Sequence, residues 1–408
     1  MPRLRVGKSL WIATDANLDA VRFPTLHKRV DVDVVIVGGG FTGAAAAWRF
    51  ADAGVRVAVL EAERIGRGST AASTALLMQE PDEDLQILAR RYSMARARRI
   101  WRAAANVTAE LIATLRRLRI DCDLRAAGSL YYTRAAKDVA RLKTEFRQRR
   151  KAGFHARWMN STAVERFAHM NAAAAIVTRG NAQLNPYRAC LGLMNAAVAR
   201  GAIVFERSKV RRIDVQKSGV AVRTAHGAVH ADRVVIATGY ATPYFKRLAT
   251  RFRMLNTYVL ATRPLSAGER HDLMPPDLML WDTQRPYHYA RWTPDHRLLL
   301  GGGDRPMVRE AARGGAMREA IGALRRYFVD LYPALERIDV EYAWEGLFAM
   351  PPDGLPFIGP HRRHPRHLFA LGYGGNGMTL GFLAGKLLLE HYEGRASADL
   401  DLFAFTRR

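Results

Sequence analysis

Three glycines with a regular spacing are the first residues in this sequence that could do chemistry. They form the pattern Gly38-x-Gly40-x-x-Gly43, which follows the β-branched run 34–37 and opens an alanine-rich segment. In a strand–turn–helix unit, such glycines allow a tight turn, a close approach of the backbone to a pyrophosphate, and close packing of helix on strand. The new helix would direct its free N–H groups and the positive end of its dipole at the phosphates. The pattern therefore predicts a dinucleotide site.

Glu61 narrows the choice of nucleotide. Residues 56–60 predict a second strand, and Glu61 follows Gly43 by 18 positions. At about this spacing an acidic residue binds the ribose hydroxyls of adenosine. A carboxylate there would repel a 2′-phosphate, so an unphosphorylated nucleotide is expected, either FAD or NAD.

A second glycine pattern lies near the end of the chain, at Gly372-x-Gly374-x-x-Gly377, between a predicted strand and a predicted helix over 379–391. Only 31 residues follow Gly377, too few for a separate NAD domain. The helix N-terminus is therefore expected to point at the same cofactor and to stabilise negative charge on its reduced ring. A reduced flavin carries such charge and nicotinamide does not, so this argument favours FAD.

The loop 69–75 is small and rich in hydroxyl groups. Its Ser69, Thr70, Ser73 and Thr74 offer donors that suit a phosphate and a flat ring system. An ordinary linker of the same composition remains an alternative reading.

Composition limits the class of protein. The chain has 408 residues, 49% of them apolar, enough for two or three domains' worth of core. Residues 1–30 lack the apolar core of a signal peptide and no run is long enough to span a bilayer, so a cytoplasmic protein is expected. Cys122 and Cys190 show no metal-ligand spacing, so neither a disulfide framework nor a metal site is expected.

The chain is strongly basic. Its 63 Lys and Arg against 38 Asp and Glu give a formal net charge of +25. Such a charge raises the question of nucleic-acid or acidic-membrane binding. The arginines are spread along the whole chain, which favours a solvated arginine-rich surface and makes a nucleic-acid partner unlikely on this reading.

Periodicity predicts a mixed α/β fold (α/β with α+β features), with a Rossmann-like FAD-binding domain and an antiparallel-sheet substrate domain. The apolar run 231–239 predicts a buried parallel strand that ends at the nucleotide, and a long helical pattern covers 83–119. Strands and turns alternate over 252–300. The expected boundaries are 1–82, 160–247 and 344–408 for a discontinuous FAD-binding domain, and 83–159 and 248–343 for the substrate domain.

The order of these motifs resembles that of the FAD-dependent D-amino acid oxidase superfamily, of the sarcosine oxidase and γ-glutamylputrescine oxidoreductase type. The likeness also includes Ser9-Leu-Trp11, Asn185-Pro-Tyr, Ala237-Thr-Gly239, the run 301–304 and Pro352-Asp-Gly-Leu-Pro356. The resemblance implies an extended FAD in the α/β domain, roofed by the second domain. It also implies removal of a hydride from a C–N bond, which gives an imine that water hydrolyses.

Several departures from the family pattern limit the resemblance. Residues 344–350 contain no cysteine that could attach the flavin, so FAD is expected to be non-covalent. The cations with which sarcosine-oxidising members hold a carboxylate are missing from the loop 69–74 and from Thr379. Leu299 stands where many oxidases carry an oxygen-activating lysine, so slow reaction with oxygen is expected.

The motifs and the resemblance together assign a set of residues to each ligand. Those expected to bind FAD are Gly38, Gly40, Phe41, Thr42, Gly43, Glu61, Ala62, Ser69, Thr70, Ser73, Thr74, Ala75, Val210, Thr238, Gly239, Gly346, Asp353, Gly372, Gly374, Gly375, Asn376, Gly377, Met378 and Thr379. Those expected to be catalytic or to wall the substrate pocket are Tyr258, Trp281, Tyr287, Tyr289, Arg291 and Trp344. Alternation along a strand places Tyr287, Tyr289 and Arg291 on one face, and Arg291 is the expected clamp for a substrate carboxylate. Aromatic residues of the sheet core and a structural Arg291 are the competing reading.

The expected function is that of an FAD-dependent amine or amino-acid oxidoreductase. Its partners would be a small amine or amino-acid substrate and either oxygen or another electron acceptor. Two alternatives stay open at this point: a flavoenzyme that acts on a modified tRNA base, and a flavin-binding subunit of a hetero-oligomeric dehydrogenase.

Overall fold

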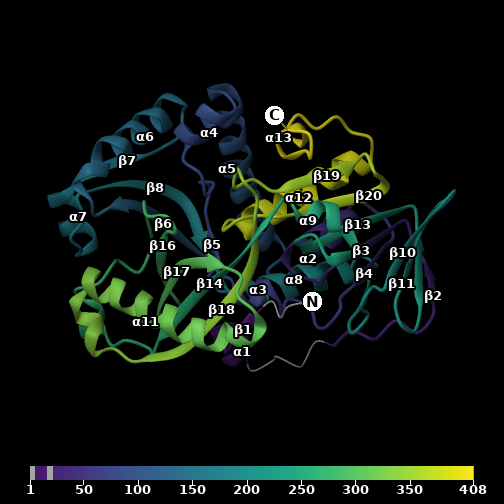
Figure 1. Ribbon diagram of the computed structural model, residues 1–408, viewed down its shortest axis with the longest axis horizontal. Coiled ribbons are helices and arrows are strands. Elements are labelled where there is room, and N and C mark those ends of the chain that lie inside the picture. Colours follow the sequence, from purple (N-terminus) through teal and green to yellow (C-terminus); the bar gives the residue numbers. More distant parts are fainter. Residues whose placement is uncertain (1–4, 16–21, 408) are drawn as a thin grey trace.

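The computed structural model describes residues 5–15 and 22–407 of the chain. Residues 1–4 and 16–21 of the expected segment 1–82, and residue 408, lie outside the described part. Three β-sheets and their covering helices form the molecule (Figure 1). This arrangement confirms the mixed α/β fold with a Rossmann-like half and a second half built on a largely antiparallel sheet. No helix among the described residues is both long enough and apolar enough to cross a bilayer.

The six-stranded sheet carries the first glycine motif. Its order is β19-β20-β13-β3-β4-β9, and its neighbours are parallel except for β19 with β20. The strands are Val34–Val37 (β3), Val57–Leu60 (β4), Ile203–Phe205 (β9), Arg233–Gly239 (β13), Phe357–His361 (β19) and His364–Leu371 (β20). Since β3 is central and covered on both faces, its sequence is a continuous apolar run rather than an alternating one.

Three helices cover one face of this sheet: α2 (Phe41–Asp52), α8 (Pro186–Val198) and α12 (Gly377–Tyr392). Helix α2 lies between the other two and contacts both. The sequence Asn185-Pro-Tyr marks the start of α8, because the Asn185 side chain accepts hydrogen bonds from the N–H groups of Tyr187 and Arg188. The other face packs against a small sheet of order β10-β11-β12-β2, formed by Arg29–Asp31 (β2), Arg212–Gln216 (β10), Gly219–Arg223 (β11) and Ala228–Ala231 (β12).

The largest sheet has ten strands, in the order β1-β18-β14-β17-β16-β15-β6-β8-β5, with β7 paired to β8. Of its pairings among described residues, only that of β15 with β6 is parallel. The strands are Arg5–Gly7 (β1), Leu76–Leu77 (β5), Arg125–Thr133 (β6), Arg157–Asn160 (β7), Ala174–Gln183 (β8), Arg253–Thr262 (β14), Leu278–Asp282 (β15), His288–Trp292 (β16), Leu298–Pro306 (β17) and Val340–Met350 (β18).

Helices α6 (Val139–Lys151), α7 (Ser161–Ala168) and α11 (Arg313–Leu331) pack against the ten-stranded sheet. The helix expected over 83–119 is divided into α4 (Leu85–Arg91) and α5 (Met94–Arg117). Ser93 causes the break, since its hydroxyl accepts a hydrogen bond from the Arg96 N–H at 3.1 Å and so caps a new helix. The short helices are Leu10–Ala13 (α1), Ser69–Ala72 (α3), Lys246–Ala249 (α9), Ala267–Arg270 (α10) and Leu400–Phe403 (α13), with single 3-10 turns at Ala136–Asp138, Pro243–Phe245, Glu310–Ala312 and Pro333–Arg337.

Sheet membership suggests domain boundaries that differ from the sequence-based ones. Residues 160–183 and 344–350 were expected in the FAD-binding domain. The first range contains β8 and the second contains most of β18, and both strands belong to the ten-stranded sheet. Strand pairing places both segments in the ten-stranded sheet, because β8 pairs with β6 and β18 pairs with β14. We propose an FAD-binding domain of residues 22–75, 184–252 and 351–407 and a substrate domain of residues 76–183 and 253–350.

Candidate FAD and substrate site

A cavity of about 390 Å³ lies where the two halves meet. The carboxyl ends of β3, β4 and β13 and the first residues of α2 and α12 form one side of it. Strands β15, β16, β17 and β18 of the ten-stranded sheet contribute the other side. The carboxyl edge of parallel strands is where open α/β sheets bind their ligands.

Close packing of α2 on β3 shapes the nucleotide end of the cavity. A Cβ atom on Gly43 would lie only 1.9 Å from the Gly38 carbonyl oxygen, and Gly38 has φ +111°. Glu61 ends β4 beside this turn, where its Oε2 accepts the Gly39 N–H at 2.7 Å and its Oε1 accepts the Glu63 N–H at 2.8 Å. Burial raises the pKa of Glu61. Each carboxylate oxygen keeps a further lone pair for a ribose hydroxyl.

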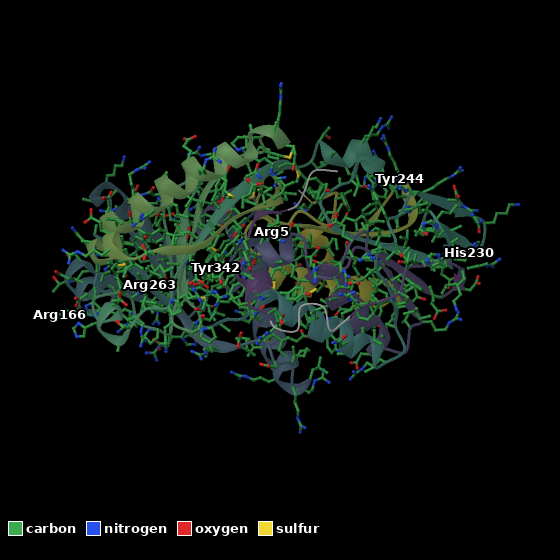
Figure 2. The ribbon with its side chains drawn as sticks, turned by 90° about the horizontal axis from the view of Figure 1, so that it is seen from below. Arg5, Arg166, His230, Tyr244, Arg263 and Tyr342 are labelled. Atoms are coloured by element: carbon green, nitrogen blue, oxygen red, sulfur yellow. The ribbon has the colours of Figure 1, made fainter. Side chains whose placement is uncertain are left out.

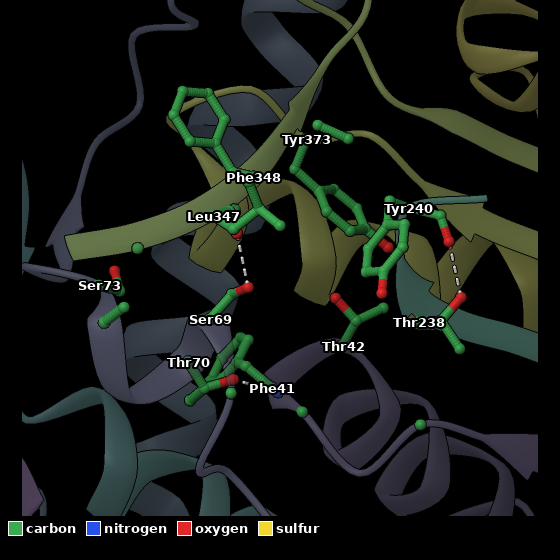
Figure 3. A pocket seen from close by; sticks show the side chains of 18 of the residues that line it. Phe41, Thr42, Ser69, Thr70, Ser73, Thr238, Tyr240, Leu347, Phe348 and Tyr373 are labelled. Atoms are coloured by element: carbon green, nitrogen blue, oxygen red, sulfur yellow. Dashed lines mark hydrogen bonds between the residues drawn. The ribbon is translucent and has the colours of Figure 1, made fainter. Parts of the chain in front are cut away.

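The hydroxyl-rich loop connects the two halves of the site. The Ser69 hydroxyl donates to the Leu347 carbonyl of β18 at 2.8 Å, as Figure 3 shows, and the Thr70 hydroxyl accepts the Phe41 N–H of α2 at 2.9 Å. Ser69 and Thr70 are therefore tied to both halves of the site, which favours a binding loop over an ordinary linker.

The second glycine pattern brings α12 to the same cavity. The Gly375 N–H donates to Oδ2 of Asp82 at 2.5 Å. Asn376 is 5% exposed, and its amide nitrogen donates to the carbonyls of Met78 and Glu80. Asn376 lines the cavity, and its Oδ1 is buried without a hydrogen-bond partner among the described residues.

The structure brings most of the selected residues together. Those that line the cavity are Gly38, Gly40, Phe41, Thr42, Glu61, Ala62, Ser69, Thr70, Ser73, Thr74, Ala75, Val210, Thr238, Gly239, Trp281, Tyr287, Tyr289, Gly346, Gly374, Gly375, Asn376, Gly377 and Met378. Seven others lie outside the lining: Gly43, Tyr258, Arg291, Trp344, Asp353, Gly372 and Thr379.

Arg291 requires a correction, because the geometry does not support a clamp for substrate. Its side chain is 1% exposed and donates to the carbonyls of Thr74, Leu184 and Trp292 at 2.5, 2.7 and 3.2 Å. Its guanidinium also lies 5.0 Å from the ring centre of Trp11. Alternation along β16 predicts the side of the sheet, but the N-terminal segment covers that side at Arg291.

Tyr258 and Trp344 also lie behind the cavity wall. The Trp344 indole N–H donates to the carbonyl of Ala72, the last residue of α3, at 2.9 Å and so supports this helix. Tyr258 is 0% exposed, and the charge of Glu345 adds to the effect of burial in raising its pKa. These positions point to structural support rather than contact with substrate.

The remaining four residues outside the lining have packing or binding partners within the protein. Gly43 packs against Gly38, and Gly372 (φ +71°) lies where a Cβ would be 2.2 Å from the Phe252 ring. The Thr379 hydroxyl donates to the Met78 carbonyl at 3.1 Å. The Asp353 carboxylate accepts two hydrogen bonds from Arg407, at 2.7 and 2.9 Å, and one from the Tyr92 hydroxyl. These four residues are held by contacts within the protein and do not line the cavity, so their assignment to FAD stays a prediction.

Three carboxylates that the sequence analysis did not select also line the cavity: Asp82, Asp304 and Glu80, the last of which accepts hydrogen bonds from Ser129 and Asn181. Burial raises the pKa of Asp82 to about 7; the charges of Glu83 and Asp304 add to this, while the Gly375 N–H and Arg285 oppose it. Burial likewise raises the pKa of Asp304 to about 6. Asp304 belongs to the run 301–304 of the family resemblance, but Asp82 has no local signal, since only the fold brings it to Gly375.

The comparisons with known proteins agree with this geometry. The family described as FAD dependent oxidoreductase (DAO) matches residues 33–391. The chain belongs to this family. It is 30% identical over 400 residues to the gamma-glutamylputrescine oxidoreductase of Escherichia coli (strain K12), covering 97% of this chain and 91% of the relative. It is 28% identical over 388 residues to the glycine oxidase of Geobacillus kaustophilus (strain HTA426), covering 92% of this chain and 97% of the relative.

Solved structures support the same fold. The crystal structure of glycine oxidase from Geobacillus kaustophilus has a TM-score of 0.75 at 24% identity, over 93% of this chain and 99% of that one. That of L-proline dehydrogenase from P. horikoshii has a TM-score of 0.76 at 19% identity, over 92% and 97%. The family assignment confirms the resemblance and makes this chain an FAD-binding flavoprotein.

The residues present fit FAD. Two helix N-termini point into one cavity, as a negatively charged pyrophosphate and a reduced ring require. Thr42, Ser73 and Thr74, which carry hydroxyl groups, also line this cavity, as a polar ligand requires. Residues near Gly38, Gly40 and Glu61 would hold the adenosine and pyrophosphate, and residues 69–75 and 374–378 would flank the flavin.

Glu61→Gln is expected to weaken FAD binding by about ten- to one-hundredfold, because the neutral amide replaces a charged acceptor of backbone and ribose hydrogen bonds. Fluorescence titration of the apoprotein with FAD measures this change. Glu63→Gln, an exposed neighbour, is the matched control and should bind FAD as the wild type does. Equal affinity of the two variants would contradict a ribose contact at Glu61.

Arg291→Met is expected to lower the free energy of unfolding by about 2 kcal/mol or more, because it leaves buried carbonyls of Thr74 and Leu184 without a donor. Chemical denaturation measures this effect. Arg166→Met at the periphery, where Figure 2 shows Arg166, is the control and should be nearly neutral. A higher KM at unchanged stability would instead restore a substrate-binding role for Arg291.

Asp82 should make stability depend on pH in a defined direction. With a folded pKa of about 7 and an ordinary unfolded pKa of 3.8, the folded state retains a proton that the unfolded state loses, so stability falls as pH rises between these values. Asp82→Asn cannot ionise and can still accept the Gly375 N–H. Its melting temperature relative to the wild type should therefore rise from pH 4 to pH 8, measured at one fixed FAD concentration. Asp277→Asn, an exposed control, should shift little, and parallel curves for Asp82→Asn and wild type would refute the raised pKa.

Proposed function

We propose that this flavoprotein removes a hydride from the carbon of a C–N bond in a small amine or amino-acid derivative. The observation that carries the proposal is the cavity itself, in which the FAD-binding motifs face Trp281, Tyr287 and Tyr289 of the other domain. The gamma-glutamylputrescine oxidoreductase and glycine oxidase relatives support this reaction class by their names. The comparisons give no support to the tRNA-base and subunit alternatives.

FAD supplies the acceptor for the two electrons and the hydrogen that leave the substrate carbon. As the C–H bond breaks, the lone pair of the nitrogen forms the C=N bond of an iminium ion, which loses its N–H proton to solvent; water then hydrolyses the imine to a carbonyl compound and either ammonia or, from a secondary amine, an amine. The protein must orient the substrate and keep water away from the flavin face. The Tyr287 and Tyr289 rings, with centres 5.8 Å apart, form an apolar wall suited to both tasks.

We further propose that FAD is bound without a covalent bond. Both cysteines are buried: the Cys190 thiol lies 3.7 Å from the Gly39 carbonyl oxygen, at the nucleotide end, and neither Cys122 nor Cys190 lines the cavity. The electron acceptor is oxygen or another oxidant. Leu299 is 0% exposed and packs with Trp344 and Val259, so it offers no cation to favour superoxide formation.

Anaerobic mixing of the holoprotein with a panel of primary amines and amino acids tests the proposed reaction. At least one compound should bleach the flavin absorption band, and air admitted afterwards should restore it slowly if oxygen is a poor acceptor. Failure of every amine and amino acid to reduce a flavin that dithionite does reduce would overturn the proposed function.

A further inference from the structure

The substrate end of the cavity is acidic and aromatic. This conclusion deepens the proposed function and rests on it. Asp82 lies in the segment after β5, Asp304 lies on β17, and the rings of Trp281, Tyr287 and Tyr289 come from β15, β16 and the turn between them. The three rings form a connected wall, with the Trp281 and Tyr287 centres 6.5 Å apart and nearly perpendicular.

Contacts bring the acidic groups to this wall. A Cβ atom on Gly375 would lie 1.9 Å from the Tyr287 hydroxyl oxygen and 3.1 Å from Oδ1 of Asp82, so the tyrosine and the carboxylate meet at one glycine. The Tyr289 hydroxyl lies 3.3 Å from the Thr257 hydroxyl on β14. Oδ1 of Asp304 is buried and has no hydrogen-bond partner among the described residues.

No cation among the described lining residues belongs to this end of the cavity; Arg285 lies behind the wall, where its guanidinium donates to the Asp82 carbonyl at 3.3 Å and lies 5.8 Å from the ring centre of Tyr287. Among the described lining residues only Arg64 and Lys209 carry positive charge. Arg64 lies 3.5 Å from Glu206, and Lys209 precedes Val210, so both belong to the nucleotide end. Arg291, the expected clamp, is bound to backbone carbonyls instead. A substrate carboxylate would therefore meet the carboxylates of Asp82 and Asp304 with no cation in the cavity lining to pair with, because Arg285 is bound to the Asp82 carbonyl; this arrangement is unfavourable for an anion.

The same lining suits a positive charge. Carboxylates and the faces of aromatic rings both attract an ammonium group, and the attraction is strongest where water is excluded. Asp82, Asp304 and Asn376 all line the same cavity and carry acceptor oxygens.

We propose that Asp82 and Asp304, with the Trp281–Tyr287–Tyr289 wall, bind a second, non-reacting ammonium group of the substrate. The nitrogen that takes part in hydride removal must be unprotonated to form the C=N bond, so the bound positive charge belongs to another nitrogen. The preferred substrates are thus aliphatic diamines or longer amines with a cationic tail, and amino acids with a carboxylate beside the reacting nitrogen are poor substrates.

A series of four-carbon compounds tests this specificity: 1,4-diaminobutane with a cationic tail, n-butylamine with a neutral tail, and 4-aminobutyrate with an anionic tail. Anaerobic flavin reduction by each compound is followed in the wild type at pH 8, and the apparent dissociation constant is taken from its concentration dependence. The diamine should bind about tenfold or more tightly than butylamine, and 4-aminobutyrate most weakly. In Asp82→Asn and Asp304→Asn the preference for the diamine should fall at least severalfold, while Asp277→Asn should retain it.

The wild-type series decides the proposal by itself, so it does not depend on the folding of a variant. Equal or tighter binding of butylamine, or a preference for the anionic tail, would overturn the ammonium site and leave the proposed oxidation of amines intact. An unchanged diamine preference in both cavity variants would overturn the role of these carboxylates. If neither the series nor a wider panel reduces the flavin, the proposed function fails together with this inference.

Discussion

The site depends on how closely helix α2 approaches its neighbours. Gly43 lets α2 touch the turn at Gly38, and two glycines of α12 let that helix approach α2 from the other side: a Cβ on Gly381 would lie 2.6 Å from the Thr42 hydroxyl oxygen, and one on Gly385 would lie 3.1 Å from the Ala46 nitrogen. Because both helices start at the cavity and cross at short range, their positive ends converge on one ligand. A larger residue at any of these positions would separate the two N-termini.

The site also depends on side chains that hold the backbone of residues 69–75 in place. The Ser9 hydroxyl donates to the Ala71 carbonyl at 2.5 Å, the Trp11 indole to the Ser73 carbonyl at 2.8 Å, and the Trp344 indole to the Ala72 carbonyl at 2.9 Å. Arg291 donates to the Thr74 carbonyl, so the carbonyls of the four consecutive residues 71–74 all accept hydrogen bonds from side chains outside the segment. The segment can therefore present its N–H groups and hydroxyls to a ligand as a rigid surface. Arg291 and Trp344, which the sequence analysis assigned to the substrate pocket, instead support this segment.

The sequence predicts what depends on local spacing. The two glycine patterns and Glu61 follow from runs of fewer than about 25 residues, in which turn, helix start and charge are determined locally. The sequence-based predictions fail where residues far apart in the chain come into contact. Alternation puts Arg291 and Tyr289 on one side of β16, but it does not reveal that Trp11, 280 positions before Arg291 in the sequence, lies against the Arg291 guanidinium. The proximity of Asp82 to Gly375 requires the complete fold for the same reason.

A protein with a net charge of +25 that carries an acidic pocket poses an electrostatic question. The surface arginines repel a cationic substrate at long range, but salt screens charges beyond about 8 Å at physiological ionic strength. Inside the cavity, the carboxylates of Asp82 and Asp304 act at contact distance and in a region of low dielectric constant, where a charge interaction is several times stronger than in water. Local charge therefore governs what the pocket binds, whereas the net charge acts on encounter rates and solubility. The arginine-rich surface and the acidic substrate end are compatible because they act over different distances.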